Sequence, residues 1–180
     1  MATNCNTLVG FSYDRCEPNL GGVQKVWLAN WEEGAVTVDT STGDTNGVIT
    51  AITTSSGNTW IEFPMRKNVA SMTSNLQVGD EGGVYVQTDL AMVFSKMETS
   101  KRLSMVSLAT GEIMAIVKDA NGLYWFLGKD NPLLASAGAG ETGTQKSDPN
   151  HYTVTLTDES REYPFQVDES ALPASIKPAA

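Results

Sequence analysis

Few residues in this sequence could carry acid–base, nucleophilic or metal chemistry. His151 is the only histidine, and it lies between Asn150 and Tyr152 at the start of an expected strand, with no serine or cysteine motif nearby. General bases and activated nucleophiles work as partnered groups, so a lone histidine at a strand end is typical of a surface residue. The sequence therefore predicts no catalytic residue and no cofactor, and we expect that the protein is not an enzyme.

The two cysteines, Cys5 and Cys16, stand eleven positions apart and have no second pair, so the spacing of a zinc site is absent. Two interpretations stay open. They are free thiols in a reducing compartment, or they form a disulfide that closes the N-terminal arm after release into an oxidising medium. No metal site is predicted under either one.

Three further patterns resemble binding motifs only in part. The run from Gly138 to Gly143 is rich in glycine like a phosphate loop, but it lacks the following Lys-Ser/Thr and no helix pattern comes after it. Asp80 and Glu81 are adjacent carboxylates in a glycine-rich turn, where nothing apolar could raise a pKa. The acidic residues at 158–162 lack the alternating oxygen ligands of a calcium loop. Solvated surface is the expected state of all three.

Composition narrows the class of protein further. The chain has 180 residues, 41% hydrophobic and 18% charged, which is typical of one globular domain spanning residues 1–180. Its 12 basic and 21 acidic residues give a net charge of -9, which argues against tight binding of nucleic acid. No apolar run is long enough for a membrane span, and the N-terminus lacks the pattern of a signal peptide, so we expect synthesis in a cytoplasm.

The elements that must position any site are mostly strands. Runs of β-branched and aromatic residues separated by glycine turns predict a mainly β protein, a β-sandwich or barrel with a long hairpin and one α-helix. We expect an N-terminal arm at 1–22, the sandwich at 23–167 and a tail at 168–180 that could reach a neighbouring subunit. The expected strands are 23–31, 36–38, 48–53, 59–65, 84–97, 112–118, 123–127, 152–157 and 163–167.

A long hairpin is expected over residues 59–97, with its reversal at the glycine-rich segment 77–83. Its second arm alternates, so side chains project to two different sides. The apolar side, expected to pack on the sandwich, carries Val84, Val86, Leu90, Met92 and Phe94. The other side carries Tyr85, Gln87, Asp89, Ala91, Val93 and Ser95. This second side is either an ordinary solvated face or the lining of a channel made by several copies.

One helix is expected at residues 99–109. Apolar residues recur there at steps of three and four, which predicts a stripe that lies on the sheet, and Gly111 is a natural C-terminal end. Thr99 or Ser100 could cap its start. The predicted stripe consists of Leu103, Val106 and either Leu108 or Ala109.

Two other features leave alternatives open. Residues 128–150 form an unusually long loop of small and polar residues, which is either mobile or ordered by another subunit. The four tryptophans all fall in expected strands, where they pack in the core or form an aromatic binding platform. They are Trp27, Trp31, Trp60 and Trp125.

The order of these elements resembles that of the tail tube proteins of tailed bacteriophages and of related secretion and injection tubes. The stretches that carry this resemblance are Lys96 to Arg102, Gly111 to Asp119, Asn121 to Gly128 and Tyr152 to Thr157. The resemblance implies a virion structural protein whose stacked hexameric rings enclose a channel for DNA passage. The expected partners are then other copies of the chain, other tail or neck proteins, and DNA that passes without specific binding, with no membrane involved.

The resemblance also implies roles for particular residues. Candidates for facing the lumen are Asp80, Glu81, Gln87 and Asp89, and acidic groups there would repel the phosphate backbone. The segment 128–150 and the N-terminal arm would make contacts between rings. Two alternatives remain open: a neck or tail-completion protein that forms a single ring, and a monomeric carbohydrate-binding module, which predicts exposed, coplanar tryptophans.

Overall fold

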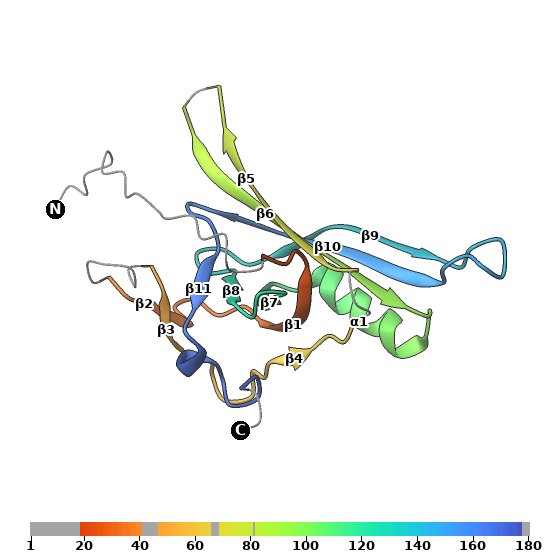
Figure 1. Ribbon diagram of the computed structural model, residues 1–180, viewed down its shortest axis with the longest axis horizontal. Coiled ribbons are helices and arrows are strands. Elements are labelled where there is room, and N and C mark those ends of the chain that lie inside the picture. Colours follow the sequence, from red (N-terminus) through yellow and green to blue (C-terminus); the bar gives the residue numbers. More distant parts are fainter. Residues whose placement is uncertain (1–18, 41–46, 66–68, 81, 178–180) are drawn as a thin grey trace.

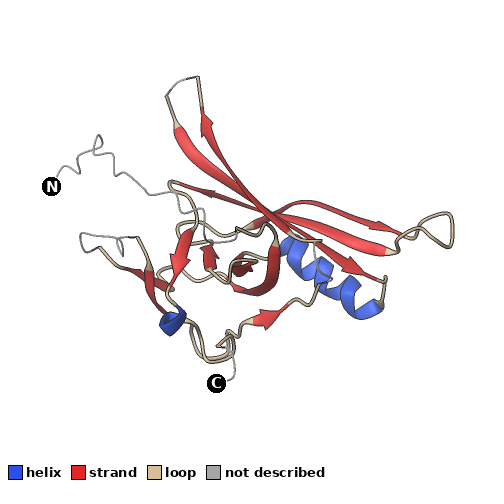
Figure 2. Ribbon diagram, viewed as in Figure 1, coloured by secondary structure: helices blue, strands red, loops and turns tan. Residues whose placement is uncertain are grey.

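The computed structural model describes residues 19–40, 47–65, 69–80 and 82–177. These residues form two β-sheets and one α-helix, which confirms the expected mainly β, sandwich-like class (Figures 1 and 2). Cys5 and Cys16 lie outside the described residues. The elements are β1 (Val23–Asn30), β2 (Val36–Val38), β3 (Ile49–Ile52), β4 (Ile61–Glu62), β5 (Ser71–Val78), β6 (Val84–Ser95), α1 (Thr99–Thr110), β7 (Ile113–Asp119), β8 (Tyr124–Leu127), β9 (Leu134–Glu141), β10 (His151–Ser160), β11 (Phe165–Val167) and the 3-10 turn η1 (Glu169–Ala171).

The larger sheet has seven strands in the order β2-β3-β11-β8-β7-β1-β4. Its central strands β1 and β7 are antiparallel, with Val26 opposite Val117 and Leu28 opposite Ala115. Both strands are apolar runs without polar alternation, and residues on both of their faces are buried. This sheet therefore separates two cores, as continuous apolar strands require.

The smaller sheet has four strands in the order β5-β6-β10-β9, all antiparallel to their neighbours. β6 and β10 pair over ten residues, from Ser95 opposite His151 to Val86 opposite Ser160. In Figure 1 the sheet crosses the molecule obliquely, and the β5–β6 hairpin extends past the body at one end. Strands β5 and β9 form its two edges.

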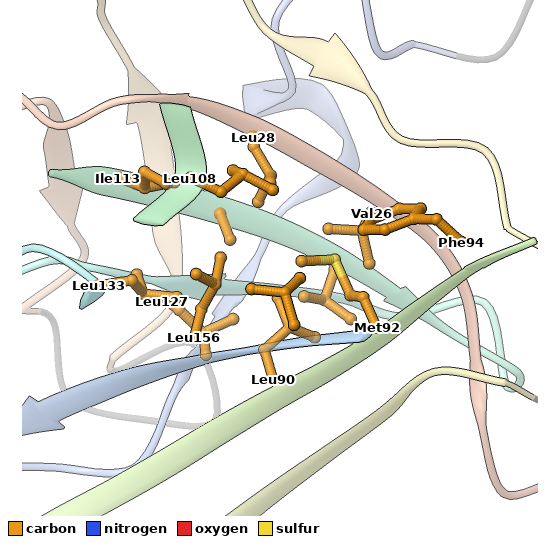
Figure 3. Packing of buried hydrophobic residues seen from close by; sticks show 13 residues of the cluster. Val26, Leu28, Leu90, Met92, Phe94, Leu108, Ile113, Leu127, Leu133 and Leu156 are labelled. Carbon is orange, nitrogen blue, oxygen red and sulfur yellow. The ribbon is translucent and has the colours of Figure 1, made fainter. Parts of the chain in front are cut away.

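The first core lies between the two sheets and the helix (Figure 3). Leu90 and Met92 of β6 and Leu156 of β10 have no exposed surface, and they meet Val26 and Val117 of the larger sheet. Their spacing of two residues follows from the alternation of a strand buried on one face only.

The second core lies on the far face of the larger sheet, where the two ends of that sheet and the chain's C-terminal segment meet. Trp60, beside β4 at one end, shares this core with Ile49 of β3 near the other end. Leu172 and Ile176 are buried there as well. Leu172 and Ile176 of the expected tail therefore pack on their own subunit.

The expected hairpin over residues 59–97 is too long at its start. The segment around β4 pairs with β1 in the other sheet, with Leu28 opposite Ile61, so only β5 and β6 form the hairpin. The expected loop at 128–150 is also corrected, because β9 lies within it and pairs with β10 from Glu141 to Leu134.

Helix α1 lies where it was expected, but it presents a different face to the sheet. Leu108 is buried and Met105 packs on the first core, whereas Leu103 and Val106 are 56% and 53% exposed. The predicted stripe is therefore wrong in two of its positions. Glu98 precedes the helix without a side-chain cap, so neither predicted capping residue serves, and the N–H of Gly111 closes the other end on the Ser107 carbonyl.

The fold predicts a large stability difference between two leucine truncations. Leu90→Ala should lower the free energy of unfolding by about 2–5 kcal/mol, because it leaves a cavity in the first core. Leu123→Ala is the matched control, because Leu123 is 40% exposed. This substitution should lower the free energy of unfolding by much less than Leu90→Ala does. Urea unfolding followed by tryptophan fluorescence measures both, and equal losses would contradict this account of the core.

Candidate assembly surface

The candidate functional surface is the face of the four-stranded sheet that points away from the core. Val86, Leu90, Met92 and Phe94 of β6 are buried on the core side. Thr88 is buried on this side as well. The alternate residues therefore point outward, and no described element packs over them; they are Tyr85, Gln87, Asp89, Ala91, Val93 and Ser95. Val84 lies on the expected side of the sheet but does not pack on the core, since it is 58% exposed beyond the end of β10.

Hydrogen bonds tie the outward side chains together across three strands. The Thr157 hydroxyl of β10 donates to Oδ1 of Asp89 at 2.6 Å, and it lies 2.8 Å from the Ser136 hydroxyl of β9. Gln87 Nε2 donates to both oxygens of Asp89 at 3.3 Å. Two predicted lumen residues, Gln87 and Asp89, are thus brought together, and the network holds their side chains along the sheet surface.

The other two predicted lumen residues are placed differently. Asp80 is exposed in the turn of the hairpin, beyond the end of the outward face, and Glu81 lies outside the described residues. The pattern Tyr152-Thr-Val-Thr-Leu-Thr157 adds three outward threonines that the lumen prediction did not include. Their alternation with Val154 and Leu156, which are buried, is the sequence signal that could have found them.

The charge of this surface has a single sign. Strands β5, β6, β9 and β10 contain no lysine or arginine, whereas their outward positions include Asp89, Glu141 and Glu159. The remaining outward residues are mainly threonine, serine, asparagine, glutamine and alanine. The face is therefore hydrophilic and weakly acidic, a surface that repels polyanions at close range.

The two edges of the sheet carry no basic side chain or proline that would block pairing, although α1 contacts β9 and β9 has one bulge against β10. β5 and β9 are eight residues long, and neither contains lysine, arginine or proline. Monomeric β proteins usually blunt such edges with charges, prolines or a covering element. The sheet has an even number of strands and all neighbours are antiparallel, so β5 and β9 run in opposite directions. If copies are related by rotation about an axis along the strands, β9 of one copy can therefore pair antiparallel with β5 of the next.

Asp158 is the one acidic residue of these strands that points into the protein. It is 3% exposed, its Oδ2 accepts the N–H of Gly128 at 3.1 Å, and its Oδ1 has no partner. Burial raises the pKa of Asp158 above its usual range, the Gly128 hydrogen bond partly opposes this, and Asp130 and Glu159 add to the rise. The expectation that this acidic cluster is solvated is therefore wrong for Asp158.

Gly128 is well suited to hold this contact. Its φ is +88°, and a Cβ there would come within 2.8 Å of Leu133 and 3.1 Å of the Met114 backbone. Only glycine combines that conformation with such close packing.

The other candidates do not form a site. Trp27 and Trp60 are buried, and Trp31 and Trp125 are partly buried, so the exposed aromatic platform expected of a carbohydrate-binding module is absent. Within the described ranges there is no group of three metal-ligating side chains and no helix that could cross a membrane. His151 lies at the start of β10, opposite Ser95 and Glu141.

Comparison with known proteins gives this chain no relative. No family model matches it, and neither the curated proteins nor the solved structures contain a match. The class of protein is thus defined by its own architecture, a two-sheet β protein in which the described residues leave one face of the smaller sheet uncovered.

Asp158 makes stability depend on pH in a defined direction. A carboxyl whose pKa is higher in the folded state stabilises the fold below the pKa of the unfolded chain, and this contribution is lost as the pH rises through the folded-state pKa. Asp158→Asn stays neutral and can still accept the Gly128 N–H. The variant should therefore gain stability relative to the wild type as the pH rises above about 4.

Urea unfolding midpoints measured from pH 4 to pH 7 test this prediction. Glu159→Gln, on the outward face, is the control for simple loss of one negative charge. A difference between wild type and Asp158→Asn that is constant over this range would contradict the buried-carboxyl interpretation.

Proposed function

We propose that this chain is a tail tube subunit, a virion structural protein whose copies form stacked hexameric rings around a channel for DNA. The observation that carries the proposal is the four-stranded sheet, with an acidic face over which no described element packs and two edge strands without lysine, arginine or proline. The resemblance in element order to tail tube proteins supplies the hexameric ring and the cargo.

The sheet has the form needed to contribute to a shared barrel. Pairing of β9 with β5 of the next copy would satisfy the backbone groups of both edges and leave no edge in a closed ring. With strands about 4.8 Å apart and tilted by about 40°, a ring of six copies would have a backbone diameter of about 48 Å. That is a wide aqueous channel, and a face rich in threonine and serine is compatible with water.

The side chains of the outward face are better suited to line a channel than to bind a nucleic acid. Asp89 and Thr157 are held by hydrogen bonds within the sheet, and no basic side chain of these strands is available to bind phosphate. Nucleic-acid affinity comes mainly from lysine and arginine contacts with phosphates. A DNA molecule would therefore pass along this face without being retained.

Blocking one edge should prevent ring formation while leaving the subunit folded. Ala137→Pro and Gly138→Pro are made as a pair, because backbone N–H groups of adjacent strand residues point to opposite sides and one of the two faces outward from β9. The variant that keeps a native circular dichroism spectrum should stay monomeric in light scattering and electron microscopy, where the wild type forms rings and tubes.

The same images separate the alternatives for the wild type. Stacked rings with an open centre would support the tube, and a lone ring would favour the neck or tail-completion protein. Rings formed by the folded proline variant would contradict edge pairing.

Reversing the charge of the outward face should affect passage more than assembly. Asp89→Lys changes each copy by two charges at a half-exposed position, so tubes should still form, while the added cations would retain DNA. Delivery of DNA by particles carrying Asp89→Lys should fall severalfold, and Asp89→Asn is the control for loss of the Thr157 hydrogen bond. Normal delivery by Asp89→Lys particles would count against a lumen position for Asp89.

A further inference from the structure

The free end of the β5–β6 hairpin carries an apolar surface on which none of the described residues packs. β10 reaches only to Val86, so the strands continue beyond the body, as Figure 1 shows. Leu76, Val78 and Val84 lie there on the core side of the sheet, and they are 53%, 68% and 58% exposed. We call these three residues the hairpin end patch.

A groove beside the helix forms a second unoccupied apolar surface. Two hollows of about 350 and 230 Å³ lie between α1 and β4, and they share Ile61, Phe63, Ser104 and Leu108 in their linings. Leu103 lines the larger hollow, and Phe94, near the far end of β6, lines the smaller one. Ile61 and Leu103 are both more than half exposed. We call this surface the helix groove.

The two surfaces carry opposite charges. Asp80 stands at the turn of the hairpin next to the hairpin end patch, and Glu81 follows it in the sequence. Three of the 12 basic residues of the chain, Lys96, Lys101 and Arg102, lie just before α1 and in its first turn, and Lys101 lines the groove. Glu98 pairs with Lys96 and Lys101, so three cations and one carboxylate leave this segment a net charge of +2. Glu62, which pairs with Lys25, lines the groove as well. This is the densest basic segment of a chain whose net charge is -9.

The two surfaces of one molecule cannot meet each other. Val84 begins β6 and Phe94 stands near its other end, so the hairpin end patch and the helix groove are separated by the length of a 12-residue strand, roughly 35 Å. Each copy therefore has one surface of each kind at opposite ends of the same sheet. Contact between a surface of the first kind and one of the second therefore requires two copies, and it is a heterologous contact that repeats along the strand direction.

We propose that the hairpin end of one copy docks in the helix groove of a second copy. Leu76, Val78 and Val84 then cover Ile61 and Leu103, while Asp80 lies near Lys101 and Arg102. This contact rests on the proposed function in one respect: in a tube it is the contact that stacks one ring on the next. Leu76 and Val78 lie in β5, but the docking contact uses their side chains, whereas edge pairing of β5 and β9 would use backbone groups.

Two single substitutions test the contact from its two sides. Val78→Asp places a charge in the hairpin end patch, and Leu103→Asp places one in the helix groove. Each should stop growth along the axis, leaving lone rings in electron microscopy and in analytical ultracentrifugation. Val106→Asp is the matched control, because Val106 is 53% exposed on the same helix and lines neither hollow.

Mixing the two variants gives the sharper result. Val78→Asp keeps a working groove and Leu103→Asp keeps a working hairpin end, so preformed rings of the two should combine into stacks of two and grow no further. In the same way, the charge-reversed variants Asp80→Lys and Arg102→Glu should stack with each other better than either stacks with the wild type. Circular dichroism confirms that each variant is folded.

The outcomes distinguish this inference from the proposed function. Tubes of normal length from both Val78→Asp and Leu103→Asp would overturn the docking contact and leave the tube intact. Linear chains of wild type without rings, cut to pairs by mixing the two variants, would support the docking contact and contradict the tube. A wild type that stays monomeric at high concentration would overturn both.

Discussion

The structure depends on the one-sided burial of its smaller sheet. Leu90, Met92 and Leu156 fill the core between the sheets without any exposed surface. Because successive residues of a strand point to opposite faces, this packing fixes Asp89 and Thr157 on the other face. A shift of register by one residue would bring Asp89 into the core, so the apolar packing also fixes the position of the polar surface.

That alternation is also why much of the fold could be predicted from sequence. The period of two in β6 and β10 is strong, and the continuous apolar runs of β1 and β7 are bounded by glycine and polar turns. Helix α1 was located to within one residue at its end because Gly111 follows it directly. Gln87 and Asp89 were placed on the outward face for the same reason, by counting from Leu90.

Two predictions were wrong for specific reasons: the loop at 128–150 and the buried face of the helix. β9 has the sequence Leu-Ala-Ser-Ala-Gly-Ala-Gly-Glu, which lacks β-branched and aromatic residues, so no local preference indicates a strand. It becomes one because β10 offers a row of free backbone groups beside it. The helix face was misjudged because the apolar residues of α1 lie on two sides: Met105 and Leu108 pack on the core, and Leu103 and Val106 do not. Spacing alone could not choose between them.

The sides and ends of the four-stranded sheet lead to two different kinds of association. Its sides are the edges β5 and β9, where pairing between copies turns each sheet relative to the last and can close into a ring. Its ends are the hairpin end patch and the helix groove, where docking between copies moves along the strand direction and does not close. A sheet that combined both would grow as a tube, with ring size set by strand tilt and length set by the end contact. Leu76 and Val78 belong to both β5 and the hairpin end patch, but edge pairing uses backbone groups and docking uses side chains, so a side-chain substitution can alter stacking while the edge stays able to pair.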